Sequence, residues 1–222
     1  MKRFKYENIL PILAIETSGN LCSAAVLLED DIYSECNVNK KNIHSEILFE
    51  LIDNTLSKPN LTINDINTIA VSEGPGSFTG LRIGMAAGKG IADGSNLPII
   101  SVPTFEALAW QISNYIVDNV KFGIANKANR DEFYFAVYQK LNGKISEIKK
   151  LQTHSVEEIN ILSKDLNCIF GNYSHSTGTE ISSPSALSIA RWAYIYGKDL
   201  LTFDYDFIEP NYFKNFKVKV KK

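Results

Sequence analysis

The sequence lacks the features that mark disulfide-rich, metal-binding and membrane proteins. Its three cysteines, Cys22, Cys36 and Cys168, have no Cys-x-x-Cys spacing, which predicts neither a disulfide framework nor a thiolate metal site. Its three histidines are isolated, with no His-x-x-x-His pair. The apolar run 9–15 is too short and too poor in small residues for a signal peptide. No run approaches the roughly 18 apolar residues of a membrane span, so we expect a cytoplasmic protein without membrane contact.

Positive charge is also scarce over most of the chain. Lys plus Arg is 23 and Asp plus Glu is 25, a formal net charge of −2. The last nine residues, Lys214 to Lys222, hold five lysines and no acid, so residues 1–213 carry about 18 bases against 25 acids. Such an acidic body repels phosphate backbones and predicts no dedicated nucleic-acid-binding surface. The basic tail either touches RNA or an acidic partner, or is a solvated terminus, which we favour.

The chain is long enough for one large domain or for two lobes of about 100 residues each. Strand-like and helical patterns alternate along it, which predicts an α/β fold. Pro103-Thr104 is typical of a hinge, and Asn142-Gly143 of a hairpin turn. We therefore predict an N-terminal α/β lobe over 1–103 and a C-terminal α/β lobe over 104–222. The expected strands are 10–17, 23–28, 32–38, 68–72, 97–102, 122–125, 133–139, 144–151 and 168–170, and the expected helices are 44–57, 79–93, 105–115, 155–162 and 185–196.

The most informative stretch is 72–90, SEGPGSFTGLRIGMAAGKG, where a Gly-Pro-Gly turn leads a strand into a helix. Helix N-termini bind anions, so a phosphate-cradling loop is one interpretation. However, the Gly-x-x-x-x-Gly-Lys-Ser/Thr spacing of a P-loop is absent, and Lys89 lies well inside the helix. We favour the alternative, a tight turn with Ser77 or Phe78 near the helix cap.

Three glycines, Gly80, Gly84 and Gly88, recur every four residues along the same helix. Each costs roughly 1 kcal/mol relative to alanine inside a helix, so another contact must offset them. Their common face allows a second backbone to approach closely. Two interpretations stay open: packing on the lobe's own sheet, or a protein–protein face shared with the helix over 44–57.

Candidate catalytic residues are few and scattered. Glu16 and Asp31 flank the first strands and are explained as turn residues, and the cluster 130–132 as a solvated edge. No serine lies in a nucleophile-elbow context, and each histidine is interpreted as a surface or capping residue. These serines and histidines are Ser18, Ser77, Ser174, His44, His154 and His175. Nothing in the sequence indicates a self-sufficient active site.

Several segments resemble the TsaB family, also called YeaZ. They are ILAIETS at 12–18, ISVPTFEAL at 100–108, the stretch 128–134 and Pro-Asn-Tyr at 210–212. The most specific match is GPGSFTGLRIG at 74–84, whose first part we call the signature loop. The residues of the signature loop that carry the resemblance are Gly74, Pro75, Gly76, Ser77, Phe78, Thr79 and Arg82. The resemblance spans nearly the whole chain.

The resemblance implies a two-lobed fold of the actin, hexokinase and Hsp70 type (ASKHA). It also implies a place in the bacterial machinery that forms N6-threonylcarbamoyladenosine beside the anticodon of ANN-decoding tRNAs. The family is similar to the transferase TsaD but non-catalytic, and the ATPase TsaE joins the pair. The expected partners are therefore TsaD, TsaE and tRNA through the complex, and a second copy when the chain is alone. The expected TsaD-binding residues are Ile47, Leu51, Gly80, Gly84 and Gly88.

Comparison with the catalytic relative predicts which chemistry this chain lacks. Thr104 and Leu108 stand where TsaD has its metal-binding histidine pair. The dipeptide Asn20-Leu21 stands where TsaD has two acidic residues. Neither threonine nor leucine can replace an imidazole ligand. Lys127 and Asn129 also depart from the usual acid and arginine of TsaB. We expect no metal, no cofactor and no activity of the chain alone; the alternatives are a glycoprotease-like metallopeptidase and a small ATP-binding ASKHA enzyme.

Overall fold

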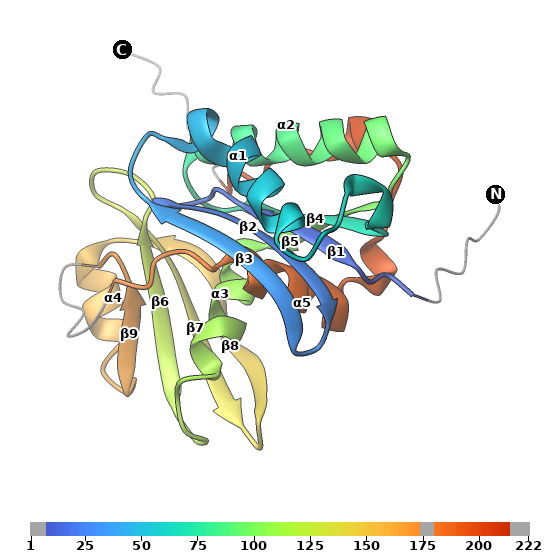
Figure 1. Cartoon of the computed structure of the whole chain (residues 1–222). Coiled ribbons are helices and arrows are strands. Elements are labelled where there is room, and N and C mark those ends of the chain that lie inside the picture. Colours follow the sequence, from blue (N-terminus) through green and yellow to red (C-terminus); the bar gives the residue numbers. More distant parts are fainter. Residues whose placement is uncertain (1–7, 174–179, 214–222) are drawn as a thin grey trace, which may run out of the picture.

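Two β-sheets with helices packed against them make up the fold, in a computed structural model that describes residues 8–173 and 180–213 (Figure 1). The first sheet has the strand order β3-β2-β1-β4-β5. Its first three strands form an antiparallel meander, and β1 then pairs in parallel with β4, which pairs in parallel with β5. The strands are β1 (Ile12–Glu16), β2 (Leu21–Glu29), β3 (Ile32–Asn39), β4 (Thr68–Gly74) and β5 (Ile99–Pro103).

Helices cover both faces of the first sheet. Helices α1 (His44–Ser57) and α2 (Phe78–Ser95) lie on one face, where Leu48, Ile52 and Met85 join the core. Helix α5 (Ala186–Tyr196) packs on the opposite face against β1 and β2, beside α3 (Thr104–Ser113) (Figure 1). Because both faces are covered, every residue of β1 is buried, which suits its four apolar residues 12–15 and also encloses Glu16 at its end.

The second sheet has the strand order β8-β7-β6-β9, and only β6 and β9 are parallel. Phe105 and Leu108 of α3 pack on one face of it, and Ile159 of α4 packs in the cluster on the other. The elements are β6 (Lys121–Lys127), β7 (Phe133–Leu141), β8 (Lys144–His154), α4 (Val156–Leu162) and β9 (Cys168–Gly171). Helix α3 therefore contributes to the cores of both sheets, which fixes one sheet relative to the other.

The structure confirms each strand and helix predicted from the sequence, with ends that differ by a few residues. The Asn142-Gly143 turn is confirmed as well, since both residues have positive φ, 51° and 73°, as a type I′ hairpin needs. Three short 3-10 helices, 63–65, 198–200 and 205–207, were not predicted. The predicted boundary between lobes at residue 103 stays a prediction, although α5, from the second half of the chain, packs on the first sheet.

Within residues 8–173 and 180–213, no helix has the length and apolar character needed to cross a membrane.

Candidate functional site

The signature loop is held by contacts at both of its ends. Gly74 has a φ of +117°, and a Cβ there would meet the Asn211 carbonyl oxygen, so only glycine fits the turn. Ser77 is the N-cap of α2, and its hydroxyl accepts a hydrogen bond from the Gly80 amide at 3.2 Å. The Ser77 amide in turn donates to the Ser18 carbonyl at 2.7 Å. The predicted tight turn with Ser77 at the cap is thus confirmed.

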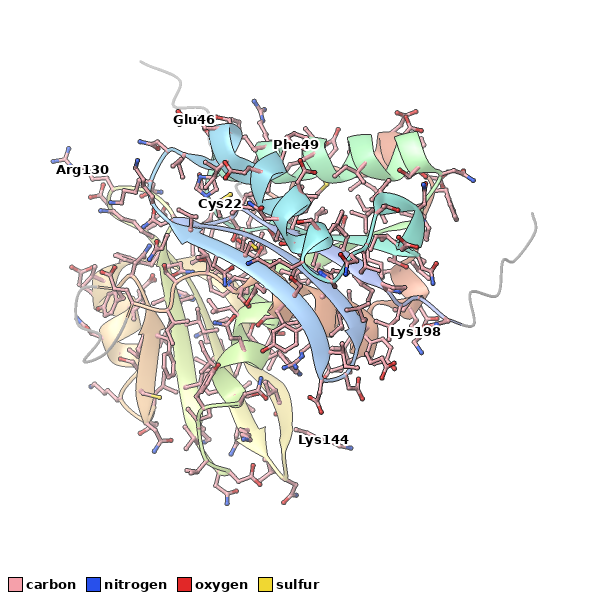
Figure 2. All side chains as sticks on the ribbon, in the orientation of Figure 1. Cys22, Glu46, Phe49, Arg130, Lys144 and Lys198 are labelled. Carbon is pink, nitrogen blue, oxygen red and sulfur yellow. The ribbon has the colours of Figure 1, made fainter. Side chains whose placement is uncertain are left out.

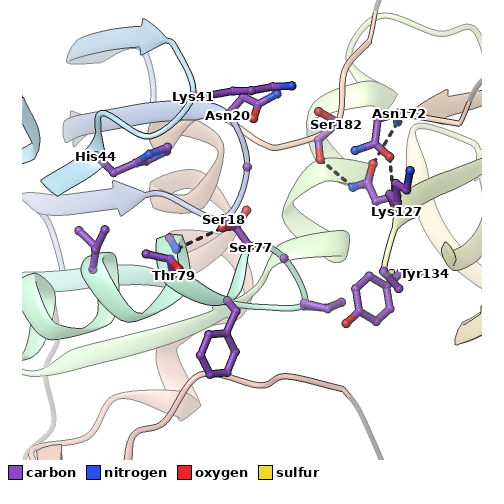
Figure 3. A pocket seen from close by; sticks show the side chains of 18 of the residues that line it. Ser18, Asn20, Lys41, His44, Ser77, Thr79, Lys127, Tyr134, Asn172 and Ser182 are labelled. Carbon is purple, nitrogen blue, oxygen red and sulfur yellow. Dashed lines mark hydrogen bonds between the residues drawn. The ribbon is translucent and has the colours of Figure 1, made fainter. Parts of the chain in front are cut away.

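A cleft of about 630 Å³ opens in front of this loop, between the end of the first sheet and the strand ends of the second (Figure 3). Serine and threonine hydroxyls at the start of α2 line one wall, with His44 and Lys41 beside them. Lys127 and Tyr134 line the opposite wall. Two lysines and the N-terminal end of an 18-residue helix give the cleft a positive character suited to an anion.

Two asparagines build the wall of the cleft that belongs to the second sheet. The side-chain amide of Asn126 donates to the Ser182 carbonyl at 2.7 Å, and its oxygen accepts from the Asn172 amide at 3.3 Å. The Asn172 side chain accepts from the Lys127 amide at 2.7 Å (Figure 3). These bonds link β6 to the segments that follow β9 and precede α5, so the position of the Lys127 backbone is fixed.

Tyr212, near the end of the described chain, borders the cleft on its third side. Its ring packs on Phe78 with 4.6 Å between centroids, and its hydroxyl accepts from Arg82 Nε at 2.8 Å. The Arg82 guanidinium lies 4.0 Å from the Phe78 ring centroid, a cation–π contact. Tyr134 donates to the Tyr212 carbonyl at 3.2 Å. In the sequence, Pro-Asn-Tyr stands out only as part of the resemblance, and no local pattern indicates this cluster, because Arg82 and Tyr212 are 130 residues apart.

Glu16 is fully buried at the end of β1, behind the signature loop. Its Oε1 accepts hydrogen bonds from the amide and the hydroxyl of Ser18, both at 2.5 Å. Its Oε2 has no partner in the described part of the chain. Burial raises the pKa of the Glu16 carboxyl to about 7, although the hydrogen bonds from Ser18 act in the opposite direction. Glu16 is therefore a buried strand residue that holds the turn after β1, so its interpretation as a turn residue is wrong. Asp31 is an exposed turn residue, as predicted.

The remaining catalytic candidates are dispersed. His44 is buried at the first residue of α1, with a ring nitrogen 3.3 Å from the Leu21 carbonyl, so its interpretation as a surface or capping residue is wrong. His154 lies 3.3 Å from Glu158 of α4. The cluster 130–132 is exposed, as predicted for a solvated edge (Figure 2 labels Arg130). Ser174 and His175 lie outside the described residues, as does the lysine-rich tail. Among residues 8–173 and 180–213, no group of three or more His, Cys, Asp and Glu side chains could hold a metal ion.

Thr104 and Leu108, which the resemblance places at the metal-ligand positions of TsaD, have structural contacts of their own. The Thr104 hydroxyl is buried and accepts a hydrogen bond from the Gly74 amide at 3.0 Å, so it supports the signature loop. Leu108 is fully buried in the core between α3 and the second sheet. Neither side chain is available to a ligand in the cleft.

The glycine stripe of α2 faces the protein's own sheet. A Cβ at Gly80 or Gly84 would meet the carbonyl or the hydroxyl oxygen of Thr17, and one at Gly88 would meet Val71 of β4. The Thr17 hydroxyl also donates to the Gly80 carbonyl at 2.8 Å, across this close approach. The interpretation of the three glycines as a partner-contacting face is therefore wrong, because β1 and β4 already occupy that face.

The predicted partner residues of α1 also lie on its inner side. Leu51 is buried in the core, and Ile47 is partly buried and packs against it. The outer face of α1 carries Glu46 and Phe49, which project from the helix (Figure 2), and 59% of Phe49 is exposed. That α1 and α2 contact a partner stays a prediction, and their outer faces are the surfaces free to do so.

Comparisons with known proteins place this site in a family context. The family model described as "TsaD: tRNA N6-adenosine threonylcarbamoyltransferase" matches residues 38–187. The chain is 30% identical to the "tRNA threonylcarbamoyladenosine biosynthesis protein TsaB" of Haemophilus influenzae, over 93% of this chain and 94% of the relative. It is 32% identical to the protein of the same name from Bacillus subtilis, over 63% of this chain and 59% of that one.

Solved structures show the same fold. A structure titled "YeaZ from Pseudomonas aeruginosa" superposes with a TM-score of 0.73 at 22% identity, covering 90% of this chain and 98% of that one. A second, described as an uncharacterized Pseudomonas aeruginosa protein with similarity to peptidase YeaZ, gives 0.74 at 21% identity, with 91% and 99% covered. The predicted two-lobed ASKHA fold is confirmed, and the chain belongs to the TsaB (YeaZ) family.

Proposed function

We propose that this member of the TsaB family is a non-catalytic subunit that binds and activates TsaD in the formation of N6-threonylcarbamoyladenosine in tRNA. The relatives' name, "tRNA threonylcarbamoyladenosine biosynthesis protein", supports a role in this modification. TsaE and tRNA are contacted through the complex, in the cytoplasm, and the isolated chain forms a homodimer.

Two buried side chains support the non-catalytic role. Thr104 and Leu108 stand where the resemblance places the metal-binding histidines of TsaD, and both are committed to internal contacts. Replacing such buried groups with ligands would disturb the signature loop and the core between the sheets. The same positions argue against the glycoprotease-like metallopeptidase, since its reaction would require a bound metal to activate water.

The exposed surface of α1 and the start of α2 is the single observation that carries the binding proposal. Phe49 on α1 is 59% exposed and Phe78 at the start of α2 is 49% exposed. Helices α1 and α2 pack side by side on one face of the first sheet. Exposed aromatic side chains on adjacent helices supply the large apolar area that dominates the energy of protein interfaces.

Substitution of Phe49 tests this proposal. We expect Phe49→Ala to weaken binding to TsaD by at least about tenfold in isothermal titration calorimetry, the loss typical of an aromatic anchor. Its melting temperature should stay close to that of the unmodified chain, because most of the side chain is exposed. Tyr115→Ala removes an 80% exposed aromatic residue beyond the end of α3 and serves as the matched control. Unchanged affinity of Phe49→Ala, or an equal loss with Tyr115→Ala, would remove α1 from the proposed interface.

The homodimer has its own test. Light scattering of the isolated chain should give the mass of two copies, near twice 24.8 kDa, at micromolar concentration. A mass of one chain across the whole concentration range would contradict this part of the proposal without affecting the binding of TsaD.

One observation favours a second candidate function, a small ATP-binding enzyme. Lys41, Lys127 and the N-terminus of α2 all border the 630 Å³ cleft, and phosphate is the kind of anion such groups bind. Equilibrium titration of the isolated chain with ATP separates the two functions. Saturable binding that Lys127→Ala weakens would favour the nucleotide enzyme, and absence of binding at millimolar ATP would favour the scaffold.

A further inference from the structure

A second cavity, away from the cleft, is lined by aromatic rings and two carboxylates. It has a volume of about 240 Å³ and lies where α3, α5 and the β7–β8 hairpin meet. Pockets for drug-sized ligands begin at roughly 300 Å³, so this one suits a single small group. The side chains that define its chemistry are Trp110, Trp192, Tyr138, Tyr196, Glu106 and Glu147.

Three elements bring these groups to one place through their local periodicity. Glu106 and Trp110 are four residues apart on α3, and Trp192 and Tyr196 are four apart on α5, so each pair shares a helix face. The rings of Trp192 and Tyr196 lie 5.7 Å apart. Glu147 of β8 is the cross-strand partner of Tyr138 on β7, which puts both side chains on the same side of the sheet.

The two carboxylates have no compensating cation. The ion pairs in the described part of the chain are His154 with Glu158 and Arg191 with Asp31, and neither involves Glu106 or Glu147. Burial and the negative charge of Glu147 raise the pKa of the Glu106 carboxyl, whereas a hydrogen bond from Trp192 lowers it. A cation between the two acids would relieve this repulsion.

The hydroxyl of Tyr138 provides a second, independent indication. The residue is 97% buried, since only 3% of its surface is exposed, and its ring stacks on Phe122 at 5.8 Å. The side chain borders the cavity, and its hydroxyl oxygen is not one of the fully enclosed atoms without a partner, so it is open to a group in the cavity. A hydroxyl both donates and accepts, so a bound polar group can hydrogen-bond to it.

We propose that this pocket binds an organic cation, an alkylammonium or guanidinium group held between the Glu106 and Glu147 carboxylates and the faces of the tryptophan rings. Aromatic rings with nearby carboxylates attract such cations through the ring quadrupole and direct charge pairing. The Arg191 guanidinium already lies 5.9 Å from the Trp110 ring centroid, but Arg191 pairs with Asp31 and does not line the cavity. The cation can come from a free polyamine or from a lysine or arginine side chain of a protein.

The two tryptophans of the chain both line this cavity, so intrinsic fluorescence reports on it directly. The full-length chain is titrated with choline and, at matched ionic strength, with 3,3-dimethylbutan-1-ol, which has the same shape without the charge. We expect a saturable change of emission with choline and none with the alcohol. Equal responses to both, or no response to choline, would overturn the proposal.

Variants locate the binding and separate the two sources of the cation. Glu147→Gln should weaken choline binding by about tenfold, the loss of one charge pair, and Glu50→Gln, an exposed acid on α1, should leave it unchanged. Glu147 is itself exposed, so its variant should keep the melting temperature. Tighter binding of spermidine identifies a polyamine, and tighter binding of N-acetyl-lysine amide or N-acetyl-arginine amide identifies a peptide side chain. Binding unaffected by Glu147→Gln would overturn the assignment to this pocket.

Discussion

Alanine substitutions along α2 separate the internal from the external glycines of one helix. Alanine is more favourable than glycine inside a helix by about 1 kcal/mol wherever the added methyl group meets nothing. A Cβ at Gly90 has no heavy atom within 4 Å, so Gly90→Ala should raise the stability by about 1 kcal/mol. A Cβ at Gly80 collides with the Thr17 backbone, and overpacking of this kind costs about 1–3 kcal/mol. After the helix gain of about 1 kcal/mol, we expect Gly80→Ala to lower the stability by up to about 2 kcal/mol.

Thermal and urea unfolding of the two variants measure this difference. In a chain of this size, 1 kcal/mol corresponds to a shift of about 2–4 °C in the melting temperature. Gly90→Ala should therefore melt a few degrees above the unmodified chain and Gly80→Ala several degrees below it. Both variants replace glycine with alanine in the same helix. The difference in stability between them therefore isolates the contact with Thr17. Equal stabilisation by both substitutions would show that the Gly80 face is free and would restore it as a candidate partner surface.

Two further predictions concern pH and RNA. Burial raises the pKa of Glu16 from 4.5 to about 7, so the folded state binds the proton more tightly, and stability should fall as the pH rises from about 4.5 to 7. Urea unfolding should show a loss of about 3 kcal/mol across this range that Glu16→Gln removes, and the same pH dependence in both proteins would contradict the assignment. The isolated chain should bind tRNA weakly, with affinity falling steeply as salt is added, and deletion of 214–222 should abolish that binding. Tight binding that persists in high salt would contradict the scaffold role.

The strands and helices could be predicted because each leaves a local pattern in the sequence. The helix 44–57 shows apolar residues at helical spacing, and Asn142-Gly143 marks its hairpin by the φ angles that only a few residues adopt. The packing of α5 on the first sheet leaves no such pattern. Its sequence shows that the helix has a buried side, and the choice of sheet depends on contacts across some 160 residues, such as that of the Ala186 amide with Ser23.

The candidate site was likewise predictable only where a local pattern marks it. Ser77 at the cap of α2 follows from its place between a Gly-Pro-Gly turn and a helical pattern. The contacts of Tyr212 with Phe78 and Arg82 join the end of the described chain to the signature loop, and no spacing rule connects them. The pocket of Trp110 and Trp192 likewise forms only when three separate elements meet. What a sequence lacks is the information on which distant faces come together.

The orientation of α2, however, was available in the sequence and decides between the two interpretations of its glycines. Small residues in a stripe indicate close approach of another backbone, and they do so equally for a sheet beneath the helix and for a partner above it. The positions of the charged residues distinguish these two cases. Arg82 and Asp93 fall on the side opposite Gly80, Gly84 and Gly88, and both are exposed in the structure. Because an unpaired charge is costly to bury, a helix with one charged side and one glycine side turns the glycines inward. We therefore expect a partner of this helix to meet its charged side, which carries Arg82, together with Phe49 on α1.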